Sequence, residues 1–396
     1  MLPISKMAAA VQPSATLAAG AKAKQLRMEG KIVHDFSLGE PDFNTPKHIC
    51  DAAYKAMMDG HTHYTAASGL VELRGAIARW YKRTYGYEFT PEQVIVSNGA
   101  KHSLHNALAS VVGPGDEVII PTPYWVSYSD LVQMTGATYV LVPTTEASGF
   151  KITPAQLKAA VTPRSKLVML NSPGNPTGSV YSRAELEALA DAALETNLGV
   201  ISDEIYEQLV YGNTRATCFA TLRPKLAEKV ITISGVSKSY AMTGWRIGWA
   251  IGPSHVVKAM GNVQSQETSS PSSISQYATI AALDGEQACV AQMRKEFEAR
   301  RDLVCRRLNA LPGIRCPIPD GAFYAFFNVS SYFGKTLKGK KIADSTSFCA
   351  AALETVHVNL VQGAAFGAEG YARLSFATSQ EQINQGIDRL AEFLQG

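Results

Sequence analysis

Lys238 is the residue of this chain whose surroundings best suit a nucleophilic amine. It lies in residues 233–249, ISGVSKSYAMTGWRIGW, among small, apolar and aromatic side chains, and Arg246 follows eight positions later. Apolar surroundings disfavour the ammonium form, so the lysine is prepared to act as a neutral nucleophile. A guanidinium group nearby is suited to bind phosphate through paired hydrogen bonds. The stretch therefore predicts an amine that attacks a carbonyl group beside an anion.

Further polar groups follow apolar runs earlier in the chain. Asp203 closes one run and Tyr206 comes shortly after it, in SDEIYEQ. A carboxylate at the end of a buried run needs a cationic partner or several hydrogen bonds. Asn175 lies in NSPGNPTGSVY, where a tight turn would by itself explain the glycines and prolines. Trp125, in PTPYWVSY, either fills the core or presents its flat face to an aromatic ring.

The segment SNGAKHS, residues 97–103, places Ala100 and Lys101 at the expected start of a helix. Backbone N–H groups at such a start can bind an anion, and the helix dipole assists. Each of these features is common by itself. Together they supply a phosphate cradle, a stacking surface, an amide and a phenol for a phenolic oxygen, a carboxylate for a ring nitrogen, and an amine for an aldehyde. Pyridoxal phosphate is the common cofactor that requires this set.

Short apolar runs that alternate with amphipathic segments must position these groups. The helical segments include residues 182–196, which has apolar positions at three- and four-residue steps. Runs that are apolar on both faces indicate a mostly parallel sheet covered by helices, with functional groups at the carboxyl ends of strands. The expected strands are residues 94–99, 116–123, 166–173, 199–206, 229–235 and 246–253.

The C-terminal third has a different pattern. Helical segments dominate from about Ser273 and return at the C-terminus, and strands are expected at 321–329, 358–363 and 372–378. This pattern indicates a smaller α+β lobe, which the N-terminal segment joins. At 396 residues the chain exceeds what one core usually supports, which agrees with two lobes. The basic run GKTLKGKK, residues 334–341, is expected to be a solvated loop.

The chain resembles the class I aspartate aminotransferase family, in its aspartate/prephenate subgroup, over almost its whole length. The resemblance implies fold type I of the pyridoxal-phosphate enzymes: an α/β large domain with a mostly parallel seven-stranded sheet covered by helices, plus a smaller α+β domain. We place the N-terminal arm and part of the small domain at 1–45, the large cofactor domain at 46–290 and the small C-terminal domain at 291–396. The motifs that carry the resemblance are PSAT (13–16), SLGEPDF (37–43), NPTG (175–178), SDEIYE (202–207), SKSYAMTGWRIGW (237–249) and RLSFATS (373–379).

The resemblance implies a role for each matching residue. Lys238 would hold pyridoxal phosphate as a Schiff base and later carry a proton between the substrate α-carbon and the cofactor. Asp203 would keep the pyridine nitrogen protonated, Asn175 and Tyr206 would bind the phenolic oxygen, and Trp125 would stack on the ring. The implied phosphate ligands are the backbone of Ala100 and Lys101, with Ser237, Arg246 and, across a homodimer interface, Tyr64.

One position departs from the family pattern. Many relatives have Ser-x-Ser-Lys at the cofactor lysine, whereas this chain has Gly235-Val236-Ser237-Lys238. The first hydroxyl group is missing, so one phosphate contact is absent or is supplied by backbone.

The same resemblance implies how an amino acid substrate binds. Arg373 matches the arginine that holds the α-carboxylate by a two-pronged hydrogen bond, and the backbone of Gly39 would close over that group. Trp125 and Asn175 border the same space. Lys101 could offer its ammonium group to a distal carboxylate, with a hydroxyl from Thr16, although a solvated lysine is the plain alternative.

The expected reaction is therefore transfer of the amino group from aspartate to 2-oxoglutarate in two half-reactions, giving oxaloacetate and glutamate. Prephenate is a secondary expectation, because Gln12 brings no positive charge to the site entrance. Aromatic or alanine aminotransferases and pyridoxal-phosphate lyases share the fold. A ligand-sensing module would need an attached helix-turn-helix domain, and GAAFGAEG has the wrong glycine spacing for a nicotinamide-binding motif.

Composition excludes several other classes of protein. A net charge of +3 gives no reason to expect nucleic acid or a membrane surface as partner. The six cysteines lack disulfide or zinc-ligand spacing, so reduced thiols, no metal site and a cytoplasmic location are expected. No apolar run is long enough to cross a bilayer. The N-terminal segment lacks the sustained apolar core of a signal peptide.

Overall fold

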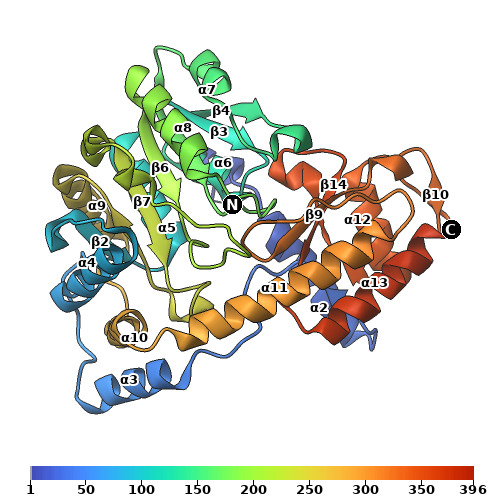
Figure 1. Cartoon of the computed structure of the whole chain (residues 1–396), viewed down its shortest axis with the longest axis horizontal. Coiled ribbons are helices and arrows are strands. Elements are labelled where there is room, and N and C mark those ends of the chain that lie inside the picture. Colours follow the sequence, from blue (N-terminus) through green and yellow to red (C-terminus); the bar gives the residue numbers. More distant parts are fainter. Residues whose placement is uncertain (1) are drawn as a thin grey trace.

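A seven-stranded sheet forms the centre of the larger lobe in the computed structural model, which describes residues 2–396 (Figure 1). The strand order is β2-β8-β7-β6-β5-β3-β4; β8 is antiparallel to both of its neighbours, and the other pairs are parallel. The strands are β2 (Val94–Ser97), β3 (Glu117–Thr122), β4 (Thr138–Pro143), β5 (Ser165–Asn171), β6 (Gly199–Asp203), β7 (Val230–Gly235) and β8 (Gly248–Ile251).

The expected mostly parallel sheet is confirmed, and each of the six expected strands is present within a few residues. The seventh strand, β4, was not expected from the sequence. It lies at the edge of the sheet, where most of its side chains are only partly buried or exposed. Its sequence, TYVLVP, nevertheless contains an apolar run at 139–142, so apolar character alone does not distinguish this edge strand from a central one.

Helices cover both faces of the sheet. Side chains alternate across a strand, so Val94 and Val96 join one core cluster while Ile95 joins the other. The cluster that contains Ile95 includes residues of α5 (Ala100–Val111), α6 (Ser127–Met134) and α9 (Ser254–Glu267). The opposite cluster includes residues of α3 (Lys47–Met58), α4 (Val71–Tyr85), α7 (Pro154–Ala160), α8 (Arg183–Glu195) and α10 (Ser273–Asp284).

The smaller lobe contains a three-stranded sheet, in the order β13-β14-β9, packed with helices of the C-terminal third. The expected strand at 358–363 is divided into β12, which pairs with the N-terminal β1, and β13. The elements are α11 (Ala288–Asn309), β9 (Tyr324–Asn328), α12 (Ser345–Val356), β12 (Val358–Asn359), β13 (Val361–Gln362), β14 (Tyr371–Ser375) and α13 (Gln380–Leu394).

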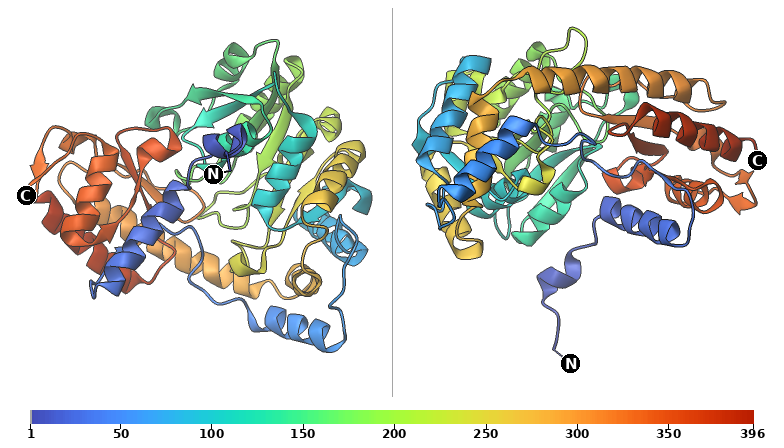
Figure 2. Two further views of the ribbon diagram at one scale, coloured as in Figure 1. Left: turned by 180° about the vertical axis from the view of Figure 1, so that it is seen from behind. Right: turned by 90° about the horizontal axis from the view of Figure 1, so that it is seen from below.

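Part of the N-terminal segment packs against elements of the C-terminal third. Strand β1 (His34–Asp35) pairs in parallel with β12, and α2 (Ala15–Met28) packs beside it. The preceding arm with α1 (Lys6–Ala10) projects away from the body (Figure 2). Helix α11 runs from one lobe to the other and includes residue 290, so no break in secondary structure marks a boundary there. The domain limits at 45 and 290 stay predictions.

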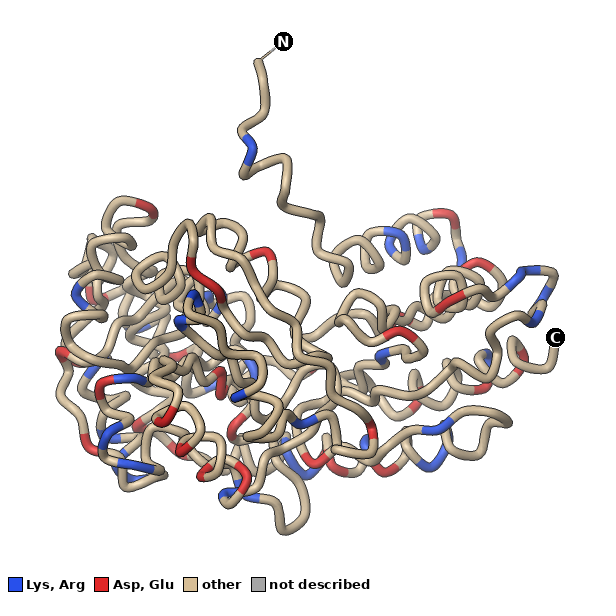
Figure 3. The backbone as a smooth tube through the Cα atoms, turned by 90° about the horizontal axis from the view of Figure 1, so that it is seen from above, with Lys and Arg blue, Asp and Glu red and all other residues tan. Residues whose placement is uncertain are grey.

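The basic run at 334–341 is mostly exposed, as expected of a solvated segment, but it forms a short antiparallel ribbon of β10 (Thr336–Leu337) and β11 (Lys340–Lys341) that was not expected. Lys340 pairs with Glu354 of α12, which anchors the ribbon. Charges of both signs are interspersed over both lobes (Figure 3). Within residues 2–396, no helix combines the length and apolar character needed to cross a membrane.

Candidate active site

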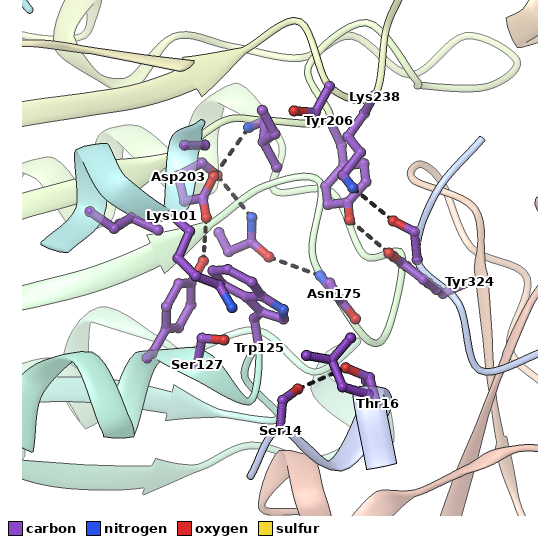
Figure 4. A pocket seen from close by; sticks show the side chains of 18 of the residues that line it. Ser14, Thr16, Lys101, Trp125, Ser127, Asn175, Asp203, Tyr206, Lys238 and Tyr324 are labelled. Atoms are coloured by element: carbon purple, nitrogen blue, oxygen red, sulfur yellow. Dashed lines mark hydrogen bonds between the residues drawn. The ribbon is translucent and has the colours of Figure 1, made fainter. Parts of the chain in front are cut away.

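A cavity of about 340 Å³ opens at the edge of the large sheet where β5, β6 and β7 end (Figure 4). Strand β8 runs in the opposite direction, so the residues that precede it reach the same edge. The cavity is lined by every predicted site residue except Tyr64: Thr16, Gly39, Ala100, Lys101, Trp125, Asn175, Asp203, Tyr206, Ser237, Lys238, Arg246 and Arg373.

Lys238 lies in the turn after β7, and its side chain crosses the cavity toward the N-terminal segment. Its amine donates a 2.7 Å hydrogen bond to the backbone oxygen of Gly39. Burial lowers the pKa of the Lys238 amine to about 8, and the positive charges of Arg246 and Arg373 act in the same direction. About a tenth of this amine is therefore neutral at pH 7, far more than for an ordinary lysine, and the neutral form is the nucleophile.

Asp203 ends β6 and is buried. One carboxylate oxygen accepts a 2.7 Å hydrogen bond from the Tyr128 hydroxyl, and the other accepts the Ile205 N–H at 3.2 Å. Burial raises the pKa of Asp203 to about 6. The carboxylate forms no ion pair with the groups that it contacts, so a cationic ring N–H of a ligand would complete its surroundings. Tyr128 was not expected, although it follows Trp125 by three residues in PTPYWVSY.

The turn between β2 and α5 forms an anion cradle. Gly99, at φ 87°, precedes the helix, and its carbonyl oxygen accepts the N–H groups of His102 and Ser103. The N–H groups of Ala100 and Lys101 have no such backbone partner in the described chain, as is usual for a first helical turn. A side chain at Gly99 would place its Cβ atom 2.4 Å from the Arg246 guanidinium. Glycine therefore permits Arg246 to lie against the helix start.

The missing hydroxyl at Gly235 has a steric reason. A Cβ atom at this position would lie 2.9 Å from the Ile247 backbone oxygen and 3.0 Å from the Gly248 Cα atom. Gly248 itself packs against the Ala100 backbone. The close approach of β7, β8 and the start of α5 thus requires glycine at position 235, which leaves Ser237 as the hydroxyl beside Lys238 in the cavity lining.

Arg373 is a buried cation without an acidic neighbour among its hydrogen-bond partners. Its guanidinium donates to the Asn175 side-chain oxygen at 3.0 Å and to the Ser37 backbone oxygen at 2.6 Å. Its Nε atom is buried and has no hydrogen-bond partner in the described chain. Burial lowers the pKa of this guanidinium. A buried, partly satisfied cation that faces a cavity is suited to bind a carboxylate.

Tyr206 and Tyr324 contact each other in the wall of the cavity. Their hydroxyl oxygens are 2.7 Å apart, and the Arg373 guanidinium lies 4.5 Å from the centroid of the Tyr324 ring. Burial, together with Tyr324, holds the pKa of Tyr206 well above its usual value. Tyr324 was not expected from the sequence, because the apolar stretch GAFYAFFNV that contains it resembles a plain core strand. The contact between Tyr206 and Tyr324 joins residues of two lobes that are far apart in the chain, so no local sequence motif indicates it.

The outer wall carries the residues expected to meet a substrate side chain. The Lys101 amine lies 4.9 Å from the centroid of the Trp125 ring. Burial and the nearby Arg246 lower the pKa of Lys101. The Thr16 hydroxyl is 2.9 Å from that of Ser14, a cavity residue that was not expected. Tyr64 lies outside this cavity and is 91% exposed, so within one chain it is not part of the site.

Comparison with known proteins gives the family. A model described as aminotransferase class I and II matches residues 31–390. The chain belongs to this family. An aspartate aminotransferase of Geobacillus stearothermophilus is 46% identical over 392 residues, which cover 99% of each chain. An aspartate/prephenate aminotransferase of Cereibacter sphaeroides is also 46% identical, over 395 residues and 99% of each chain.

Solved structures of aminotransferases have the same fold. The crystal structure of an aspartate aminotransferase from Rhizobium meliloti is 43% identical and superposes with a TM-score of 0.97, covering 100% of this chain and 99% of the other. An aspartate aminotransferase of Thermus thermophilus with maleate is 40% identical, with a TM-score of 0.93, covering 99% and 100%. The expected fold type I is thus confirmed.

This aminotransferase family uses pyridoxal phosphate, and the cavity residues fit that group. The open N–H groups of Ala100 and Lys101 beside Arg246 suit a phosphate. The buried Asp203 suits a protonated ring nitrogen, and the Lys238 amine suits an aldehyde. The cavity residues therefore suit the phosphate, the ring nitrogen and the aldehyde of the cofactor.

Proposed function

We propose that this aminotransferase transfers the amino group of aspartate to 2-oxoglutarate with pyridoxal phosphate, which Lys238 holds through its amine. The main support is the buried Arg373, which lines the same cavity as Lys238 and has neutral hydrogen-bond partners. That cation suits the α-carboxylate shared by all amino acid substrates. The same cavity contains the nucleophilic amine and the buried carboxylate that the cofactor requires.

Pyridoxal phosphate, when bound, supplies a carbonyl group that condenses with amines and a ring that accepts the electron pair released at the substrate α-carbon. Asp203 would keep the ring nitrogen protonated, and Trp125 would stack on the ring. Asn175 and Tyr206 donate hydrogen bonds to the phenolic oxygen. Ala100, Lys101, Ser237 and Arg246 bind the phosphate.

Lys238 is the residue that moves the proton. Its neutral amine, when free, would remove the proton from the substrate α-carbon and hold it for return to the product. The hydrogen bond from Lys238 to the Gly39 oxygen favours this role, because it holds the amine beside the segment that would cover the substrate. Gly39 would close over the α-carboxylate and exclude water.

Lys101 and Thr16 support a preference for acidic substrates. The Lys101 ammonium lies at the Trp125 face, beside the expected ring position, and can meet a distal carboxylate of aspartate or glutamate. Two relatives carry aspartate in their names, which agrees with this preference.

Prephenate is a second candidate substrate. A neighbouring cavity of about 450 Å³ shares Ser14, Lys101 and Ser127 with the first and extends along the N-terminal arm past Gln12. It offers room for a ring beyond the distal carboxylate. The relative from Cereibacter sphaeroides is named for both aspartate and prephenate.

A homodimer is part of this proposal. Tyr64 is exposed and does not line the cavity of its own chain, and the N-terminal arm projects from the body, so both are available to a second copy (Figures 2 and 3). Tyr64 would then bind the phosphate in the partner subunit's site. Each active site would consequently depend on two chains.

A half-reaction screen tests the proposal. Purified protein with bound cofactor is mixed with one amino acid at a time, and the absorbance of the cofactor is followed as it changes to the amine form. Fast conversion by aspartate and glutamate, with slow conversion by alanine and phenylalanine, supports the proposal. Fast conversion by neutral donors would contradict the preference for acidic substrates. Transfer of the amino group from the amine-loaded protein to prephenate, giving the corresponding amino acid, would support the second candidate. Absence of a cofactor band would overturn the assignment.

A further inference from the structure

Tyr324 lies where several predicted site residues meet. It belongs to β9 of the smaller lobe, is 1% exposed and lines the cavity (Figure 4). Its hydroxyl oxygen is 2.7 Å from that of Tyr206, and its ring packs under the Arg373 guanidinium. It therefore contacts a residue proposed to bind the cofactor and another proposed to bind the substrate.

The position of the Tyr324 hydroxyl is fixed from two sides. The Tyr206 and Tyr324 rings meet edge to face, with centroids 5.8 Å apart and an interplanar angle of 85°. A Cβ atom on Gly39 would lie 2.6 Å from the Tyr324 hydroxyl oxygen, so the glycine leaves just enough space for it. The Gly39 carbonyl in turn accepts the Lys238 amine. The hydroxyl is thus held between β9, the turn after β6 and the segment that contains Gly39.

Hydrogen-bond directions follow from counting protons. Each phenol has one proton to donate and can also accept. If Tyr206 donates its proton to a ligand oxygen, the 2.7 Å contact is retained only when Tyr324 donates to the Tyr206 oxygen. A phenol that accepts a hydrogen bond becomes a stronger donor in a chain of this kind. The charged groups that face the pair are Arg373 from β14, Asp203 at the end of β6, and Lys238.

We propose that Tyr324 is a positioning residue that acts through Tyr206: its hydroxyl orients the Tyr206 proton toward the phenolic oxygen of the bound cofactor. This inference rests on the proposed function, because it needs a ligand oxygen at Tyr206. Tyr324 lies in the smaller lobe and Tyr206 in the turn after β6, so the hydrogen bond links the two lobes at the reactive end of the cavity.

A double-mutant cycle on the cofactor-loaded protein tests the inference. The Lys238–cofactor Schiff base changes its absorbance on protonation, and hydrogen bonds to the phenolic oxygen set the pH midpoint of that change. Tyr206→Phe is expected to raise the midpoint. Tyr324→Phe is expected to raise it by roughly 0.4 to 1 unit, the size of one neutral hydrogen bond. The double variant is expected to match Tyr206→Phe alone.

Tyr332→Phe is the matched control, because that hydroxyl donates to the Pro312 oxygen in the smaller lobe and does not line the cavity. It should leave the midpoint unchanged. The inference is overturned if Tyr324→Phe does not shift the midpoint, if its shift adds fully to that of Tyr206→Phe, or if the control shifts equally. Absence of a cofactor band in the unaltered protein would instead overturn the proposed function, and this inference with it.

Discussion

The Lys238 amine lies 2.7 Å from the backbone oxygen of Gly39, a residue 199 positions earlier in the chain. The contact brings the turn after β7 against the N-terminal segment that joins the smaller lobe. It also gives the lysine a neutral acceptor instead of a carboxylate, so burial can lower its pKa. This hydrogen bond therefore links the proposed nucleophile, Lys238, to the segment around Gly39 that is proposed to cover the site.

Capture of pyridoxal phosphate by the cofactor-depleted protein should depend on pH through Lys238. The neutral amine is the nucleophile, and its pKa is about 8. The rate should therefore rise about tenfold per pH unit below 8 and level off above it. Stopped-flow absorbance measures this profile. Lys238→Ala should form no bond that borohydride can trap, and should lose turnover while keeping its fold; a trapped adduct in that variant would assign the nucleophile elsewhere.

Asp203→Asn should separate stability from activity. Folding raises the Asp203 pKa from 3.8 to about 6, so the folded cofactor-depleted protein loses stability as pH rises through that window. The variant does not titrate, so it should gain up to about 3 kcal/mol over the unaltered protein above pH 6, and nothing below pH 4. Denaturant unfolding at both pH values measures the gain.

With cofactor bound, the same Asp203→Asn variant should transaminate orders of magnitude more slowly, because an unprotonated ring accepts electrons poorly. Tyr128→Phe is the comparison, since it removes the hydrogen bond to Asp203 but retains the charge. A near-normal rate in Asp203→Asn would exclude the proposed role of Asp203.

Arg373→Lys should weaken binding of every amino acid substrate. Lysine retains the charge but cannot reproduce the paired hydrogen bonds of a guanidinium. We expect a loss of about 1.5–3 kcal/mol, or roughly ten- to a hundredfold in the dissociation constant. Titration with alanine, aspartate and phenylalanine measures it. A loss restricted to aspartate would instead place Arg373 at the substrate side chain.

Lys101→Met should change specificity. The variant keeps the length of the side chain over Trp125 but removes the positive charge. kcat/KM for aspartate and glutamate should fall about ten- to a hundredfold, the size of a charge-assisted hydrogen bond, while the value for alanine should change little. Equal losses for all three donors would indicate that Lys101 serves the cofactor and does not read the side chain.

Mixing two inactive variants should restore activity if Tyr64 serves the partner subunit. A Tyr64→Ala chain retains Lys238, and a Lys238→Ala chain retains Tyr64. When the two chains pair at random in equal amounts, about half of the dimers contain one of each, and each of these has one intact site. About a quarter of all sites would therefore be intact. Steady-state assays before and after subunit exchange measure the recovery. No recovery above the Tyr64→Ala homodimer, with exchange confirmed by mass, would contradict the proposed sharing of sites.

The sequence by itself determined the sheet and most of the cavity. Central strands are buried on both faces, so their continuous apolar runs are visible, and the polar residues that follow them collect at one sheet edge. Asp203 and Lys238 could be assigned in this way. Strand β4 was not predicted, although its sequence TYVLVP also contains an apolar run.

Tertiary structure alone decided the contacts between distant segments. Tyr324 and Tyr128 belong to stretches that resemble ordinary core. Their hydroxyl groups contact the hydroxyl of Tyr206 and the carboxylate of Asp203, respectively, each far away in sequence. The glycine at position 235 has the same kind of cause, since the approach of β8 excludes a side chain there. Periodicity and motifs report what a residue's neighbours along the chain require. They do not report which distant atom shares its hydrogen bond, because tertiary packing, within a lobe or between the two lobes, sets that distance.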